Sequence, residues 1–177
     1  MTGSLETKVL LYSDGSDQSF SAAVYTATLL KNMPSMSLTV VQTEEAAQHA
    51  PDLEYSWLNT WPTTPSRDLR ERVIDESDAA TKKVYDEIRT KTVRIFTERG
   101  LKVTHEVIPA GVNISDTVEA ILEFAKRNKC ELIVMGTRGL TSLKGLLFGS
   151  LAHEMLTKST IPVLLIKKLP QEFIDDL

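Results

Sequence analysis

The chain alternates short apolar runs with longer stretches in which apolar residues recur at helical spacing. The strand-like runs lie at 9–12, 37–42, 102–109, 132–135 and 163–166, and the helical patterns lie at about 17–30, 78–99, 114–125 and 150–158. Strands that alternate with helices in this way indicate a parallel sheet connected by right-handed crossovers. We therefore expect an α/β fold: a single-domain, open five-stranded parallel sheet with helices on both faces.

The length of 177 residues suits one domain with one sizeable core. One stretch, at about 43–77, interrupts the pattern with prolines and mixed charges, and it carries Trp57 and Trp61. A long irregular segment inside a compact domain is usually functional or disordered. It either folds over a ligand as a lid or packs its own aromatic residues as a surface loop. The acidic tail at about 169–177 is expected to fray.

Composition argues against several classes of protein. The net charge of −4 disfavours nonspecific nucleic-acid binding, which needs many cations. No apolar run approaches the roughly 18 residues that span a membrane, and the first residues lack the apolar stretch of a secretory signal. A cytoplasmic protein is expected. The single cysteine, Cys130, rules out an internal disulfide and is expected to be a buried structural thiol.

The strongest motif is Gly136-x2-Gly139-x9-Gly149-Ser150, which starts at the end of a strand and finishes at the start of a helix. Glycine lets backbone N–H groups approach a phosphate closely. The free N–H groups and the dipole of a helix N-terminus favour an anion. Each glycine alone could serve only a turn or a cap, but the set in this context predicts phosphate binding. The pattern is neither a Walker P-loop nor the dinucleotide motif.

These residues resemble the ATP-binding motif of the universal stress protein family. Val9–Ser16 is similar to that family's first strand and its Asp-Gly-Ser turn, Glu131–Gly139 to its fourth strand, and Ile161–Ile166 to its last. The resemblance covers most of the chain except the segment at 43–77. It implies the family's adenine-nucleotide α-hydrolase-like fold and a site for ATP, with AMP or ADP as alternatives.

The resemblance also implies which residues hold the nucleotide. Asp14 and Val41 would hold the adenosine end, and the backbone of Tyr12 and Ser13 would flank the base. The ribose and phosphates would lie against a second group: Gly111, Met135, Gly136, Gly139, Gly149, Ser150 and Leu151. Arg138 and Lys144 are further candidates, because a cation there could screen phosphate charge.

No metal site of the protein's own is predicted, because His49, His105 and His153 lack a typical ligand spacing. Mg or Mn could still enter with the nucleotide, held by its phosphates. The sequence offers no base to activate water, because Asp14 is assigned to the nucleoside. We therefore expect a nucleotide-dependent sensor or switch with an unknown protein partner and little or no hydrolysis.

Two alternatives remain. The first is an adenine-nucleotide α-hydrolase-type enzyme that transfers an adenylyl group or hydrolyses ATP slowly. Such enzymes carry Ser-Gly-Gly-x-Asp-Ser after the first strand, whereas Asp14 stands here where a glycine should admit pyrophosphate. The second is a non-catalytic dimerisation module without a ligand. Val163–Ile166 would form a sheet edge open to pairing, and the family resemblance implies a homodimer through this last strand.

Overall fold

The computed structural model describes residues 6–43, 83, 86–111, 113–138 and 148–175. The labelled elements, in chain order, are β1 (Thr7–Tyr12), α1 (Asp17–Asn32), β2 (Met36–Thr43), β3 (Thr104–Ile108), α4 (Ile114–Arg127), β4 (Leu132–Gly136), α5 (Ser150–Lys158), β5 (Val163–Ile166) and α6 (Gln171–Asp175). A further helix runs over 86–97 before β3. Except for α6, these are the elements that the alternating pattern predicts.

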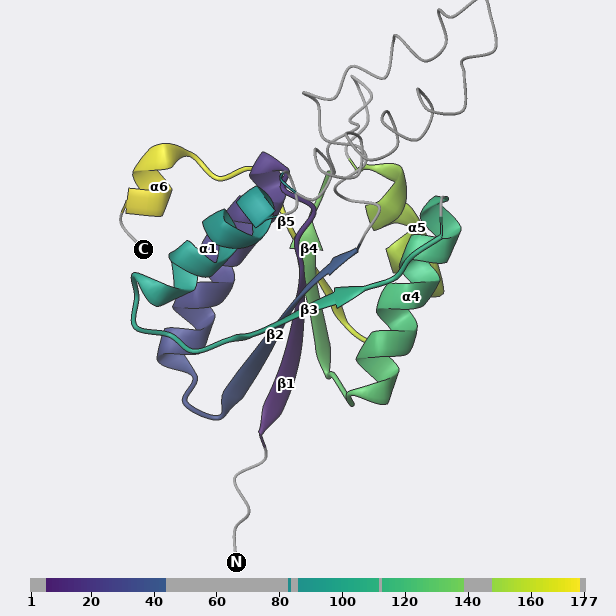
Figure 1. The fold of residues 1–177 in the computed structure, drawn as a ribbon, viewed down its shortest axis with the longest axis horizontal. Coiled ribbons are helices and arrows are strands. Elements are labelled where there is room, and N and C mark those ends of the chain that lie inside the picture. The colour runs from purple at the N-terminus through teal and green to yellow at the C-terminus, as the bar shows by residue number, and fades with distance from the viewer. Residues whose placement is uncertain (1–5, 44–82, 84–85, 112, 139–147, 176–177) are drawn as a thin grey trace, which may run out of the picture.

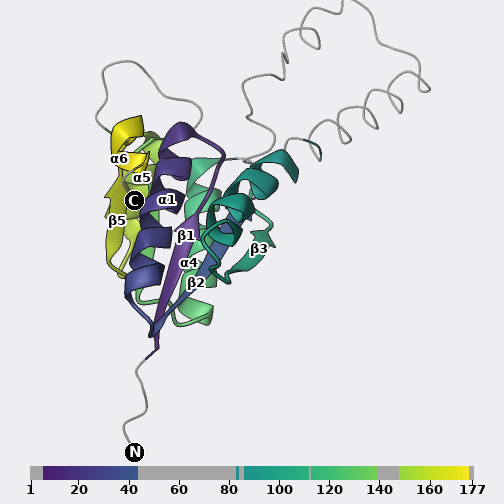
Figure 2. The ribbon, with the colours of Figure 1, turned by 90° about the vertical axis from the view of Figure 1, so that its left-hand side faces the viewer.

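The sheet has five strands in the order β3-β2-β1-β4-β5, and every pairing is parallel. β1 lies at its centre, where it pairs with β2 from Thr7 to Tyr12 and with β4 from Val9 to Leu11. Figure 1 shows α1 and helix 86–97 on one side of the sheet and α4 and α5 on the other. Figure 2 shows β5 and β3 at opposite edges. The expected doubly covered parallel sheet is confirmed.

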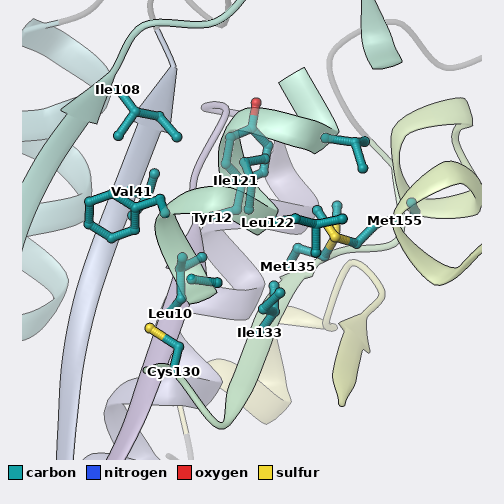
Figure 3. Close-up of a cluster of buried hydrophobic side chains, with 14 residues drawn as sticks. Leu10, Tyr12, Val41, Ile108, Ile121, Leu122, Cys130, Ile133, Met135 and Met155 are labelled. Carbon is teal, nitrogen blue, oxygen red and sulfur yellow. The ribbon is translucent and has the colours of Figure 1, made fainter. Parts of the chain in front are cut away.

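Each face of the sheet has its own hydrophobic core, because successive strand residues point to opposite sides. On the side of α1 and helix 86–97 lies the Phe96 cluster: Val9, Leu11, Ala22, Ala23, Ala27, Met36, Leu38, Val40, Phe96, Val134 and Ile166. On the side of α4 and α5 lies the Tyr12 cluster: Leu10, Tyr12, Val41, Ile108, Val118, Ile121, Leu122, Phe124, Ala125, Cys130, Ile133, Met135, Ala152 and Met155. Figure 3 shows the second cluster.

Local sequence explains where the helices begin and end. Ser16 caps α1 by accepting a hydrogen bond from the Ser19 amide at 3.1 Å, and Asn113 caps α4 by accepting one from the Asp116 amide at 2.9 Å. Gly100, with φ of +68°, follows the last turn of helix 86–97, as the sequence predicts. These caps set the helix N-termini at the carboxyl edge of the sheet.

The C-terminal tail corrects one expectation, since the structure describes a helix rather than a frayed end. α6 forms over Gln171–Asp175, and the Leu169 amide donates a hydrogen bond to Ser21 Oγ at 3.0 Å. Leu169 also packs against the Phe96 cluster, and Lys168 Nζ lies 2.5 Å from Asp17 Oδ2. The tail docks on α1 because the apolar side chain of Leu169 packs against the Phe96 cluster. The acidic composition of the tail gave no indication of this contact.

None of the helices within the described ranges has the length and apolar content that crossing a bilayer requires. The predicted lid or loop containing Trp57 and Trp61 lies outside the described residues, except that Thr43 forms the last residue of β2.

Candidate nucleotide site at the switch between β1 and β4

The strand order reverses between β1 and β4, so the chain leaves these two neighbouring strands toward opposite faces. In open α/β sheets this is where ligands bind, at the carboxyl ends of the strands. Asp14 follows β1, and Thr137 and Arg138 follow β4. The structure therefore brings the two sequence segments that carry the predicted motif residues to one point on the rim.

Asp14 occupies the N-terminal end of α1. Its Oδ1 accepts hydrogen bonds from the Ser16 amide at 3.0 Å and from Ser16 Oγ at 2.6 Å. Ser16 Oγ also lies 3.2 Å from the Arg138 carbonyl oxygen, which ties the two strand ends together. Gly15, with φ of +81°, makes this tight turn possible. The carboxylate thus accepts the Ser16 amide, which would otherwise be available to an external anion.

Burial raises the pKa of Asp14 above its usual value, although the hydrogen bonds from Ser16 and Ser19 oppose that shift. The partly buried carboxylate is therefore held by donors but poorly solvated. A carboxylate in this place disfavours pyrophosphate at the start of α1, which is where the α-hydrolase alternative needs it.

The N-terminal end of α5 differs from those of α1 and α4. Its N-cap is Gly149, which makes no side-chain capping bond, and its first turn contains no acidic residue. By contrast, α1 has the Ser16 cap and Asp17, and α4 has the Asn113 cap and Asp116. The first amides of a helix have no intrahelical acceptor. Among these three described helices, α5 alone presents its first turn with neither a side-chain cap nor an acid.

The backbone around α5 holds this end close to β4. The Gly149 amide donates to the Thr137 carbonyl at 2.8 Å, and the Thr137 amide donates to the Ile166 carbonyl at 2.9 Å. Ser150 is exposed as the first residue of α5, whereas Leu151 is partly buried against the Tyr12 cluster. The predicted phosphate residues Gly149, Ser150 and Leu151 are thereby placed together beside the end of β4.

Gly136 has a packing role that the motif alone does not reveal. A Cβ at this position would lie 2.8 Å from Gln18 Cβ, 2.9 Å from the Gln18 carbonyl carbon and 3.0 Å from the Ser19 nitrogen. The missing side chain therefore lets the first turn of α1 approach the end of β4. Gly111 is similar at the start of α4, since a Cβ there would lie 2.1 Å from Asp116 Oδ2.

The residues predicted at the nucleoside end are largely buried. Val41 is fully buried, and its carbonyl accepts the Ser13 amide at 2.9 Å. Tyr12 and Met135 lie with it in the Tyr12 cluster, as Figure 3 shows. Tyr12 Oη lies 3.2 Å from Thr43 Oγ1, so Thr43 closes this part of the rim. Extending the strand pattern by one residue would have indicated Thr43.

The remaining candidate residues either fall outside the described residues or make contacts that the motif did not predict. Gly139 and Lys144 lie outside the described residues. Arg138 is described, and its backbone carbonyl contacts Ser16. Within the described ranges, no group of three His, Cys, Asp or Glu side chains could hold a metal ion. Thr92, which sequence reasoning did not select, contacts Ser13 with its Oγ1 at 3.2 Å; its place in helix 86–97 gave no signal for that contact.

Comparison with known proteins assigns the chain to a family. The model of the universal stress protein family matches residues 7–167. A universal stress protein of Methanocaldococcus jannaschii, MJ0531, is 30% identical over 168 residues, which cover 95% of this chain and 86% of the relative.

Two solved structures share the fold. UspA from Lactobacillus plantarum, at 18% identity, has a TM-score of 0.62 and covers 91% of this chain and 97% of its own. A universal stress protein from Archaeoglobus fulgidus in complex with dAMP, at 19% identity, has a TM-score of 0.54 and covers 92% and 99%. Because the family model matches residues 7–167, which include all five strands, the chain belongs to the universal stress protein family.

Proposed function

We propose that this protein binds an adenine nucleotide, ATP foremost, at the rim between β1 and β4, and acts as a nucleotide-dependent sensor or switch. The phosphates lie at the N-terminal end of α5, and Asp14 and the carboxyl end of β2 hold the nucleoside. The observation that carries the proposal is the contrast among helix N-termini: α1 and α4 carry caps and acids, whereas α5 carries neither. A relative of the same fold was solved with dAMP.

Electrostatics support this placement of the phosphates. The dipole and free amides of α5 attract an anion, and its first turn contains no carboxylate to compete. Gly139 and Arg138 are proposed to line the same phosphates, with Met135, Gly136 and Gly111 toward the ribose. A Mg or Mn ion would be held mainly by the phosphates. Homodimer formation through β5 and a cytoplasmic location remain part of the proposal.

Little or no hydrolysis is expected from the isolated protein. Asp14, the carboxylate that follows β1, has its Oδ1 engaged with Ser16, and we assign it to the nucleoside rather than to activation of water. The role is therefore proposed to be binding, with the bound state read by a protein partner. Release of phosphate or pyrophosphate at enzymatic rates would favour the α-hydrolase alternative instead.

The test introduces a carboxylate at the start of α5. Ser150→Asp places a negative charge on the first turn, which favours the helix dipole but repels a phosphate by about 1–4 kcal/mol at 4 Å. Calorimetric titration should show ATP affinity at least about fivefold weaker, with unfolding stability unchanged or raised. Ser115→Asp, in the first turn of the already capped α4, is the matched control and should bind as the wild type does. Equal affinity in Ser150→Asp and wild type would overturn the phosphate assignment.

A further inference from the structure

Two polar side chains on the sheet face that helix 86–97 covers have nitrogen atoms without hydrogen-bond partners. Gln42, on β2, is 2% exposed, and its Nε2 is unpartnered. Both ring nitrogens of His105, on β3, are also buried and unpartnered. Buried polar atoms are nearly always paired in folded proteins, so three unpaired nitrogens on neighbouring strands call for an explanation.

The strand register places the two side chains on the same face. Val40 pairs with His105, and Gln42 follows Val40 by two residues, so both side chains share the direction of Val40. Val40 belongs to the Phe96 cluster, and Val103, two residues before His105, packs against that cluster. Figures 1 and 2 show helix 86–97, in teal, beside β2 and β3. His105 and Gln42 therefore face this helix.

The charge that acts on His105 comes from the same helix. Burial lowers the pKa of His105, and the positive charge of Arg89 lowers it further. Asp86 and Arg94 lie with Arg89 along an outer stripe of the helix. The neighbouring strand segments contribute uncharged residues to this face: Val40 and Gln42 from β2, and Val103 before β3. Both effects favour the neutral form of the imidazole.

The helix that covers His105 also braces the turn that carries Asp14. Thr92 Oγ1 lies 3.2 Å from Ser13 Oγ and donates to the Ile88 carbonyl at 2.8 Å. Ile88 packs so tightly on Gly15 that a Cβ there would lie 2.6 Å from Ile88 Cδ1. Any shift of helix 86–97 away from the sheet would therefore release Ser13 and Gly15.

We propose that His105 makes the docking of helix 86–97 acid-sensitive and that the helix passes this sensitivity to the Asp14 turn. When the imidazole takes up a proton from solvent, a second cation stands beside Arg89, and the residues of β2 and β3 that share its face offer no carboxylate. The helix then separates from β3, and Thr92 and Ile88 no longer hold Ser13 and Gly15. The consequence for nucleotide binding rests on the proposed function, whereas the consequence for the helix does not.

Hydrogen exchange tests the first part of the proposal, the acid-sensitive docking of helix 86–97. Amide protection in 92–99 and 13–16 is measured from pH 7.5 to 5.5 and corrected for the intrinsic exchange rate. Below the unfolded histidine pKa of about 6.5, wild-type protection should fall by up to tenfold per pH unit, since the opened state binds the proton more tightly. His105→Phe should abolish this fall. His153→Gln, which removes an exposed histidine of α5, should retain it.

Arg89→Gln provides a second variant that does not depend on His105→Phe folding. Removing the neighbouring cation should reduce the acid-dependent loss of protection, because protonated His105 is then less disfavoured. The proposed acid-sensitive docking of helix 86–97 is overturned if His105→Phe loses amide protection with falling pH as the wild type does, or if Arg89→Gln leaves the loss of protection unchanged.

ATP titration at pH 7.5 and 5.5 tests the link to the site. Apparent affinity scales with the fraction of molecules in which the helix is docked, so wild-type affinity should fall more than that of His105→Phe over this interval, by at most about tenfold. The same pH dependence of affinity in both proteins would refute the link. Absence of ATP binding at both pH values would instead refute the proposed function, and hydrogen exchange would still decide the role of His105.

Discussion

Replacing Gly136 with alanine tests whether this motif glycine serves packing as well as the proposed phosphate site. The added Cβ would lie 2.8–3.0 Å from Gln18 and Ser19, and two of those three atoms belong to the backbone of α1. Ordinary contact distances begin near 3.4 Å, so the first turn of α1 or the end of β4 must move by several tenths of an ångström. Overpacking of this kind costs about 1–3 kcal/mol.

Urea denaturation measures this loss directly. With a slope of about 2 kcal/mol per molar urea for a domain of this size, the midpoint should fall by about 0.5–1.5 M. Gly100→Ala is an instructive control, because Gly100 has open space around it but a φ of +68°. It should lose about 1 kcal/mol through backbone strain alone. If the Gly136→Ala protein were as stable as the wild type but bound ATP more weakly, the packing role would be refuted. Gly136 would then serve only the proposed phosphate site.

Three further substitutions probe the rim. Asp14→Asn should weaken ATP binding by about ten- to a hundredfold, since a hydrogen bond to a charged group contributes about 1.5–3 kcal/mol. Burial raises the folded-state pKa of Asp14. The free energy of unfolding of the wild-type protein should therefore fall as pH rises above about 4, where the unfolded chain gives up this proton more readily than the folded chain. The stability of Asp14→Asn relative to wild type, followed by denaturation between pH 3.5 and 7, should therefore increase with pH; a constant difference would contradict the burial argument. Ser16→Ala should cost about 1 kcal/mol in unfolding free energy through loss of the α1 cap, and an unchanged urea midpoint would show that Asp14 alone caps the helix. Gly111→Ala should cost about 1 kcal/mol or less, because the clash is with the Asp116 side chain, and a loss as large as that of Gly136→Ala would show that Asp116 cannot move aside.

The fold was predictable because each strand and helix carries its own local signal. The apolar stripe of α4, with Val118, Ile121 and Leu122, is buried as its spacing predicts. Proline and glycine mark the ends of several elements. The docking of the tail was not predictable in this way, since Leu169 contacts a cluster built from residues far away in the sequence.

The positions of the candidate site residues in the fold were predictable only where the motif is local. Gly149 and Ser150 stand at the start of a helix in sequence as in structure. The packing role of Gly136 depends on how closely α1 approaches β4. The spacing of residues in the motif does not reveal that approach. The same holds for His105 and Thr92, whose positions beside β2 and Ser13 follow from strand register and from a helix distant in sequence.

An amide chemical-shift titration with ATP tests the central proposal most directly. If the phosphates lie at the uncapped end of α5, the largest shifts among helix amides should fall on Ser150, Leu151 and Ala152, with Ser13 and Asp14 shifting at the nucleoside end. The first-turn amides of α1 and α4, already occupied by Ser16 and Asn113, should shift less. Shifts concentrated at the start of α1 or α4, or none at saturating ATP, would contradict the proposal.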